Sequence, residues 1–137
     1  MANLKESLLK EQNRLEKILR KAEKQLKDAP QGTMRLSSSK KQVQYYHCMP
    51  GEKKNGRYLP KTEEQLIQRL AQKSYDEKVA KLAGKRLAQI RRITKDYEED
   101  EIEKLFSDEH IERKKLISPI VPTWEQRVEK WVSEDCL

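Results

Sequence analysis

The sequence predicts a mainly α-helical fold with a small three-stranded antiparallel β-meander, arranged as an extended helical module. Three observations lead to this prediction. Apolar residues recur at spacings of three and four over residues 3–28 and again over 62–97, which is the period of an amphipathic helix. The stretch between them alternates apolar or aromatic residues with polar ones and is broken by Pro and Gly, as strands and turns are. With 39% charged and 35% hydrophobic residues, the chain favours a thin core.

Residues 3–28 are predicted to form the first helix, which Pro30 stops. Its apolar stripe consists of Leu4, Leu8, Leu15, Ile18, Leu19, Ala22 and Leu26. The stripe is long enough for a coiled coil with another helix or another copy, but Gln12 interrupts it. We therefore favour packing of this helix against the rest of the chain, and keep the coiled coil as the alternative.

The β-meander is predicted over residues 32–60. Its strands are expected at 32–38, 42–49 and 57–59, with turn-forming residues between them and Pro60 at the end. One acidic and seven basic residues lie between positions 29 and 61. This sheet is therefore a candidate for contact with an anionic partner.

Three tyrosines, Tyr45, Tyr46 and Tyr58, interleave with the basic residues of this sheet. Nucleic acid bases stack on aromatic side chains while cations hold the backbone. Because adjacent strand residues point to opposite faces, one of Tyr45 and Tyr46 must face inward. A stacking platform and ordinary inward packing therefore both remain open.

A long helix is predicted over residues 62–97. Thr62 is the expected N-cap, and Gln65 three residues later completes a capping box. A bend or break at 74–76 is left open, and Gly84, which costs about 1 kcal/mol relative to Ala in a helix, could allow close helix packing. The outer edge of this helix is basic and includes Arg69, Lys73, Lys78, Lys81, Lys85, Arg86, Arg91, Arg92 and Lys95.

Residues 98–137 are predicted to form short helices, with Ser107 as the cap of the one over 108–116. Pro119 and Pro122 are expected to keep residues 117–122 extended, because each disfavours a helical conformation of the residue before it. A last helix is then predicted to carry Trp124 and Trp131. Two Trp side chains on so short a helix need a surface on which to be buried. That surface is either the long helix or a partner.

The charge is divided unevenly along the chain. The net charge is +7, but residues 1–95 carry 24 Lys/Arg against 10 Asp/Glu, or +14, and residues 96–137 carry 6 against 13, or −7. A concentrated basic half is typical of a protein that neutralises phosphates. The alternative is that the cations line solvated helix faces and that the acidic part folds back on them.

These patterns give two sets of candidate binding residues. Nucleic acid is expected to contact Arg35, Lys40, Lys41, Tyr45, Tyr46, Arg57, Lys61, Arg69, Lys73, Arg86, Arg91 and Arg92. A partner protein or a second copy is expected to contact Leu8, Leu15, Leu19, Trp124 and Trp131. We favour a non-catalytic nucleic-acid-binding module, with a protein interaction module as the alternative.

No pattern for catalysis or for a cofactor, metal ion or small-molecule substrate is evident. His47 and Cys48 are strand neighbours that point to opposite faces, so they cannot share a metal ion. The four glycines form no phosphate-binding loop. No apolar run approaches the roughly 20 residues of a membrane span, and the amino terminus is charged. We therefore expect a cytoplasmic protein that is not an enzyme.

Four segments carry a family resemblance: GTMRLSSSKKQVQYYHCM (32–49), GRYLPK (56–61), LIQRLAQKSYDEKV (66–79) and IERKKLISPIVPTWEQRVEKW (111–131). In this order they resemble the amino-terminal region of an uncharacterised family of Firmicutes proteins. The longer members continue into a restriction-endonuclease-like (PD-(D/E)XK) nuclease domain. This sequence stops shortly after Trp131, so the family's catalytic carboxylates have no counterpart in it. The resemblance implies an accessory module that positions nucleic acid or packs against the nuclease domain.

Overall fold

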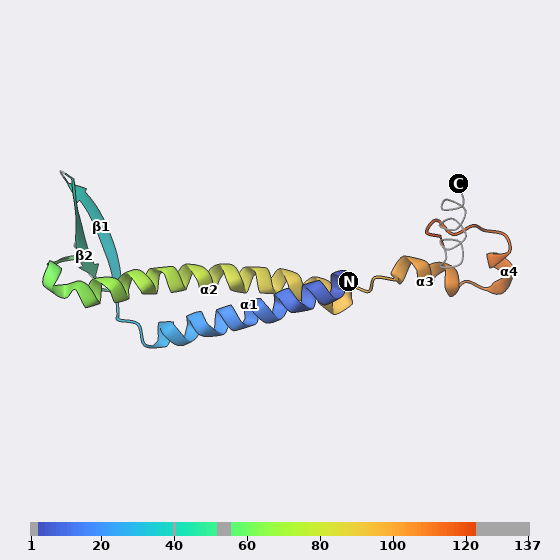
Figure 1. The fold of residues 1–137 in the computed structure, drawn as a ribbon, viewed down its shortest axis with the longest axis horizontal. Helices are drawn as coiled ribbons and strands as arrows, with labels where there is room; N and C mark the ends of the chain where they lie inside the picture. Colours follow the sequence, from blue (N-terminus) through green and yellow to red (C-terminus); the bar gives the residue numbers. More distant parts are fainter. Residues whose placement is uncertain (1–2, 40, 52–55, 123–137) are drawn as a thin grey trace, which may run out of the picture.

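The computed structural model describes residues 3–39, 41–51 and 56–122, and it confirms a mainly α-helical fold with a small β-meander. The elements are, in chain order, α1 (Leu4–Lys27), β1 (Thr33–Ser39), β2 (Gln42–Cys48), β3 (Arg57–Leu59), the 3₁₀ turn η1 (Lys61–Glu63), α2 (Glu64–Asp96), α3 (Glu101–Ser107) and α4 (Ile111–Lys114). Helices α1 and α2 lie side by side over most of their lengths, and the sheet stands at one end of the pair (Figure 1).

Helices α1 and α2 form an antiparallel hairpin whose connection holds the three strands. Its core consists of Leu15 from α1 with Ala83 and Leu87 from α2, flanked by half-buried Ile18, Leu19 and Ile90. The middle of the apolar stripe of the first helix, from Leu15 to Ala22, therefore packs within the chain, as favoured over a coiled coil with another molecule, whereas Leu4 is 53% exposed. A side-chain cap that the sequence analysis did not predict begins α1, where the Oδ1 atom of Asn3 accepts the Glu6 N–H at 2.8 Å.

The sheet has the strand order β1-β2-β3 with both pairs antiparallel. Arg35, Tyr46 and Tyr58 are cross-strand partners, and so are Leu36, Tyr45 and Leu59 on the opposite face. The Tyr45 face is turned toward the start of α2, and there Leu59 is only 2% exposed. The face that carries Tyr46 is the outer face of the sheet.

Helix α2 begins differently from the prediction at Thr62. The Glu63 N–H bonds to the Pro60 carbonyl at 2.9 Å, which winds residues 61–63 into the 3₁₀ turn η1 before the α-helix begins at Glu64. No side chain caps either η1 or α2. Thr62 therefore lies inside the turn, and the predicted capping box is wrong.

The structure answers two questions about α2 that the sequence left open. The helix passes through residues 74–76 without a break, because Asp76 is buried against α1 and accepts a hydrogen bond from Gln72 instead of interrupting the backbone ladder. Gly84 does not serve close packing, since a Cβ atom placed there would have no neighbour within 4 Å.

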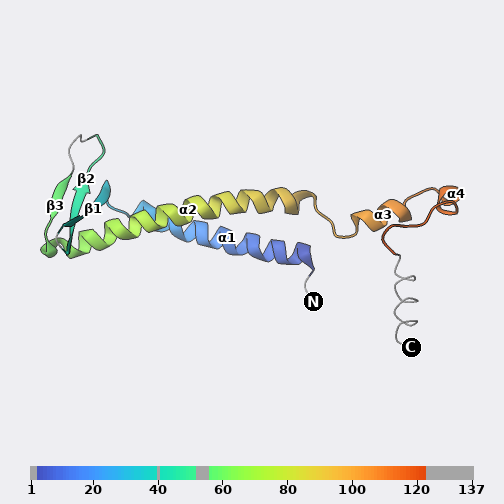
Figure 2. The same ribbon diagram turned by 90° about the horizontal axis from the view of Figure 1, so that it is seen from above.

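The residues after α2 form two short helices beyond the end of the hairpin (Figure 2). Ser107 is the last residue of α3, where its hydroxyl donates to the Glu103 carbonyl, so it does not cap the next helix. His110 does this instead, because its Nδ1 accepts the Glu112 N–H at 3.1 Å. Trp124 and Trp131 lie outside the described residues. In the described part of the chain, no helix has the length and apolarity that a membrane crossing needs.

Candidate nucleic-acid interface

Four cations of α2 share the face of the helix that points away from α1. Lys85 lies two residues after Ala83 and two residues before Leu87. At about 100° per residue it is therefore about 200° around the helix from each of these core residues. Lys78, Lys81 and Arg92 project within about 60° of the same direction, and all four are exposed. We call these four residues the α2 stripe. From 78 to 95 the chain contains seven cations and no carboxylate. Glu77 and Asp96 flank this stretch, each four residues from a stripe residue, Lys81 and Arg92.

Two predicted phosphate contacts, Arg69 and Lys73, instead hold the chain between α1 and β1. The guanidinium of Arg69 donates to the Asp28 carbonyl at 2.6 Å. The Nζ of Lys73 donates to the carbonyls of Pro30 and Gly32 at 2.9 and 2.8 Å. These carbonyls follow the end of a helix and have no partner of their own within it. Both cations therefore position the sheet against α2.

Arg86 and Arg91 lie on the sides of α2. Arg91 forms an ion pair with Glu16 of α1 at 3.0 Å, and this hydrogen bond, supported by one from Gln12, lowers the pKa of the Glu16 carboxyl. Arg86 donates to Gln89 at 2.9 Å and lines a hollow between the helices. Arg91 therefore has a role in the hairpin itself, whereas Arg86 is exposed at its surface.

The outer face of the sheet brings a cation and two aromatic rings together. The Arg35 guanidinium lies over the Tyr46 ring, 4.3 Å from its centroid. The Tyr46 and Tyr58 rings meet edge to face with centroids 5.8 Å apart, and Tyr58 is 50% exposed. The Tyr46 hydroxyl donates to Gln44 on the same face. Tyr58 therefore offers the accessible ring of this group.

The other predicted contacts of the sheet are dispersed. Tyr45 faces α2 and lines a hollow of about 410 Å³ with Lys61 and Ile67. Arg57 is exposed on the same side of the sheet as Tyr45. Lys41, with φ +75°, is exposed in the tight turn between β1 and β2, and Lys40 lies outside the described residues.

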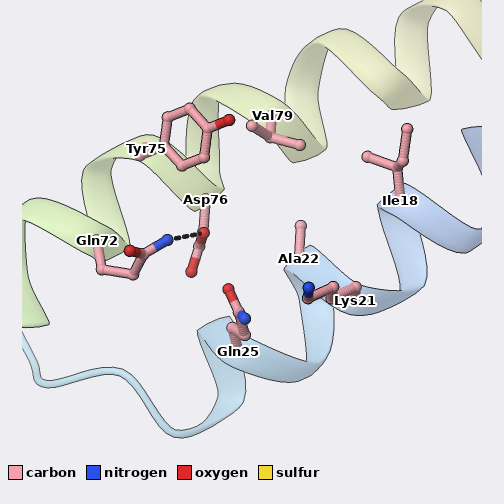
Figure 3. Close-up of a pocket in the computed structure, with 8 residues that line it drawn as sticks. All are labelled: Ile18, Lys21, Ala22, Gln25, Gln72, Tyr75, Asp76 and Val79. Atoms are coloured by element: carbon pink, nitrogen blue, oxygen red, sulfur yellow. Dashed lines mark hydrogen bonds between the residues drawn. The ribbon is translucent and has the colours of Figure 1, made fainter.

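A buried polar cluster lies between α1 and α2 near the sheet (Figure 3). Asp76 is 5% exposed and accepts from the Gln72 amide at 2.8 Å. With its amide oriented to donate, Gln25 of α1 lies 2.9 and 3.1 Å from the two Asp76 oxygens. The hollow beside this cluster measures about 250 Å³ and includes Tyr75. The cluster fixes the position of α1 along α2, so its role is to stabilise the hairpin.

The predicted protein contacts on α1 are largely used within the chain. Leu15 belongs to the core, Leu19 packs against it, and Leu8 is half-buried. Among the described residues, no three His, Cys, Asp or Glu side chains converge as metal ligands.

Three stripe residues, Lys78, Lys81 and Lys85, were part of the predicted basic edge but not of the predicted contacts. The signal that distinguishes them is present in the sequence, because they are spaced by three and four in a stretch without carboxylates. Choosing them required knowing which face of α2 packs on α1. Tyr58 was likewise noted beside the basic residues but not among the contacts.

Comparisons of this chain with protein-family models, curated proteins and solved structures find no match.

Proposed function

We propose that this protein is a non-catalytic module that binds nucleic acid through the phosphate backbone. One observation carries the proposal: the α2 stripe places Lys78, Lys81, Lys85 and Arg92 on one exposed helix face, in a stretch without carboxylates. Solvated helix faces ordinarily mix charges of both signs. A face of one sign instead attracts a polyanion and releases its condensed counterions.

The dimensions of the stripe suit a phosphate backbone. From Lys78 to Arg92 the helix rises about 21 Å at 1.5 Å per residue. Duplex DNA carries one negative charge per about 1.7 Å of axis, so each cation has a phosphate within reach. Contacts of this kind position a protein on nucleic acid and carry little sequence information. We therefore infer weak sequence preference.

The outer face of the sheet supports the proposal with a second contact. Tyr58 has an accessible ring beside the pair formed by Arg35 and Tyr46. An unpaired base can stack on such a ring, which contributes about 1–3 kcal/mol per base. Because Tyr58 is in β3, three residues before the turn that leads into α2, this second contact lies at the amino-terminal end of the helix that carries the stripe.

The resemblance to the Firmicutes family adds a biological setting to this proposal. There the corresponding segment precedes a nuclease-like domain. We infer that the module positions nucleic acid for a nuclease-type domain, and the binding test below is independent of this inference.

The proposal is tested by fluorescence anisotropy with labelled single-stranded DNA, duplex DNA and RNA at several salt concentrations. If four cations neutralise four phosphates of the duplex, the slope of log K against log salt is about −3.6, and affinity falls about 150-fold between 50 and 200 mM salt. Replacing two stripe residues, Lys81→Ala with Lys85→Ala, should make this slope shallower by about 1.8.

The matched control is Lys17→Ala with Lys24→Ala, which removes the same charge from exposed positions on α1. The control should keep the slope of the parent protein. Equal changes in slope for the two pairs would reject the stripe as the contact surface, and absence of binding at 50 mM salt would reject nucleic-acid binding altogether.

A further inference from the structure

An acidic segment with exposed apolar side chains follows the hairpin. Residues 98–109 carry seven acidic residues and one Lys, and we call them the acidic arm. Its helix α3 exposes 62% of Ile102 and 73% of Leu105, which lie three residues apart on one helix face. Adjacent exposed apolar side chains with a polar rim are characteristic of an interaction surface.

An apolar groove with arginine side chains beside it runs along one side of the hairpin. It measures about 350 Å³, and its apolar lining includes Ile18 of α1 with Val79 and Leu82 of α2. Leu82 is 54% exposed within this lining. Arg14 and Arg86 stand at its rim, where Glu11 is paired with Arg14. We call it the flank groove, and its rim has a positive balance that complements the arm.

The acidic arm is directed away from the flank groove of its own chain. The Lys5 ammonium forms an ion pair with Glu98, and the Lys5 N–H donates to Glu99 at 2.8 Å. These two bonds fasten the first residues of the arm to the amino-terminal end of α1. From there α3 continues outward beyond the hairpin, as both views show (Figures 1 and 2).

The surface of the chain is large enough to supply such a contact. The chain exposes 11900 Å², whereas a compact monomer of 16.3 kDa exposes about 7,500 Å². A standard interface removes about 800 Å² from each partner. The excess surface is therefore several times what a stable dimer requires.

We propose that the acidic arm of one chain docks in the flank groove of a second copy of this chain. Ile102 and Leu105 lie against Leu82 and Val79, and the acidic residues of the arm approach Arg14 and Arg86. When each arm occupies the partner's groove, the contact is reciprocal and closes at two chains. The groove adjoins the α2 stripe, because Leu82 lies one turn from both Lys78 and Lys85, but no stripe residue lines it, and the test below uses no nucleic acid.

The test is sedimentation equilibrium of the full chain and of two variants at physiological salt. Leu105→Asp changes the arm and Leu82→Asp changes the groove, and both positions are exposed, so both variants should keep the helical circular dichroism of the parent. Each substitution removes two copies of a leucine contact, which corresponds to at least tenfold weaker dimerisation. The control is Leu116→Asp, an exposed leucine outside the arm, and it should dimerise like the parent.

Mixing the two variants distinguishes this arrangement from other dimers. One chain then retains an intact groove and the other an intact arm, so a mixed dimer with one of the two contacts should form more tightly than either variant self-associates. A parent chain that is monomeric throughout would overturn the proposal. So would a dimer that both variants preserve.

Discussion

At the scale of single residues, alanine in place of Gly84 and alanine in place of Gly32 should change stability in opposite directions. A Cβ atom at Gly84 would meet nothing within 4 Å, and glycine costs a helix about 1 kcal/mol relative to alanine. Gly84→Ala should therefore raise the free energy of unfolding in urea by about 1 kcal/mol. Gly32 has φ +89°, and its Cβ would lie 2.5 Å from the Cys48 carbonyl oxygen, so Gly32→Ala is the contrasting variant.

Gly32→Ala should lower the same free energy by about 1–3 kcal/mol, the usual cost of a strained backbone conformation. The measurement is urea unfolding followed by circular dichroism. If Gly84→Ala were destabilising, an unseen close contact of α2 would have to be present at this position.

The cations of α2 show why individual contacts could not be predicted from the sequence. Lys73 and Lys78 look equivalent there, since both are basic residues of one helix. Lys73 donates hydrogen bonds to two backbone carbonyls in the connection between α1 and β1. Lys78 is exposed on the face of α2 that points away from α1. Which of the two lysines bonds the backbone depends on where residues 28–32 pass along α2. The helical repeat of the sequence does not predict this path.

The pairing of α1 with α2 should depend on pH through Glu16. Its pKa is lowered chiefly by the hydrogen bond from Arg91 and then by that from Gln12, so the folded state favours the carboxylate. This stabilisation is fully present above the ordinary pKa of 4.5 and is lost as the pH falls through the lowered value in the folded state. Glu16→Gln should therefore destabilise the hairpin at pH 7.

The measurement compares urea unfolding of the parent and of Glu16→Gln from pH 7 to pH 3, with Glu23→Gln as a matched loss of charge on the same helix. The difference between the parent and Glu16→Gln should narrow below pH 4.5. A difference that stays constant over this range would show that Glu16 acts through packing and not through its charge.

The two long helices and the three strands were predictable from the sequence, and their ends lie within two residues of the predicted ones. The period of three and four identified α1 and α2, and the alternation with turn residues identified all three strands. The beginning of α2 was missed because the Pro60 carbonyl accepts the Glu63 N–H and forms a 3₁₀ turn. Whether α2 continues through Asp76 stayed open in the sequence, because the partners of Asp76, Gln72 and Gln25, come from both helices.

At the scale of the whole molecule, the thin core explains the extended shape. The core cluster lies along a single seam between α1 and α2, so the two helices lie side by side and the chain stays extended (Figure 1). The composition predicted this much. The opposite net charges of residues 1–95 and 96–137 could be read from the sequence. The position of the acidic arm, beyond the hairpin and away from the α2 stripe, could not.

This separation of charge predicts a salt-dependent influence of the arm on nucleic-acid binding. Lys78, Lys81 and Lys85 lie about 16 Å or more along α2 from Asp96, at 1.5 Å per residue, which exceeds the Debye length of about 8 Å at physiological salt but not that of about 30 Å at 10 mM. Of the stripe residues, Arg92 alone lies nearer. Neutralising the arm with Glu101→Gln, Glu103→Gln and Asp108→Asn should therefore strengthen DNA binding at 10 mM salt and have little effect at 150 mM, measured by anisotropy. An uncharged peptide nucleic acid probe is the control and should show no gain. An equal gain at both salt concentrations would mean that the arm contacts the binding surface directly, because only a short-range interaction escapes this screening.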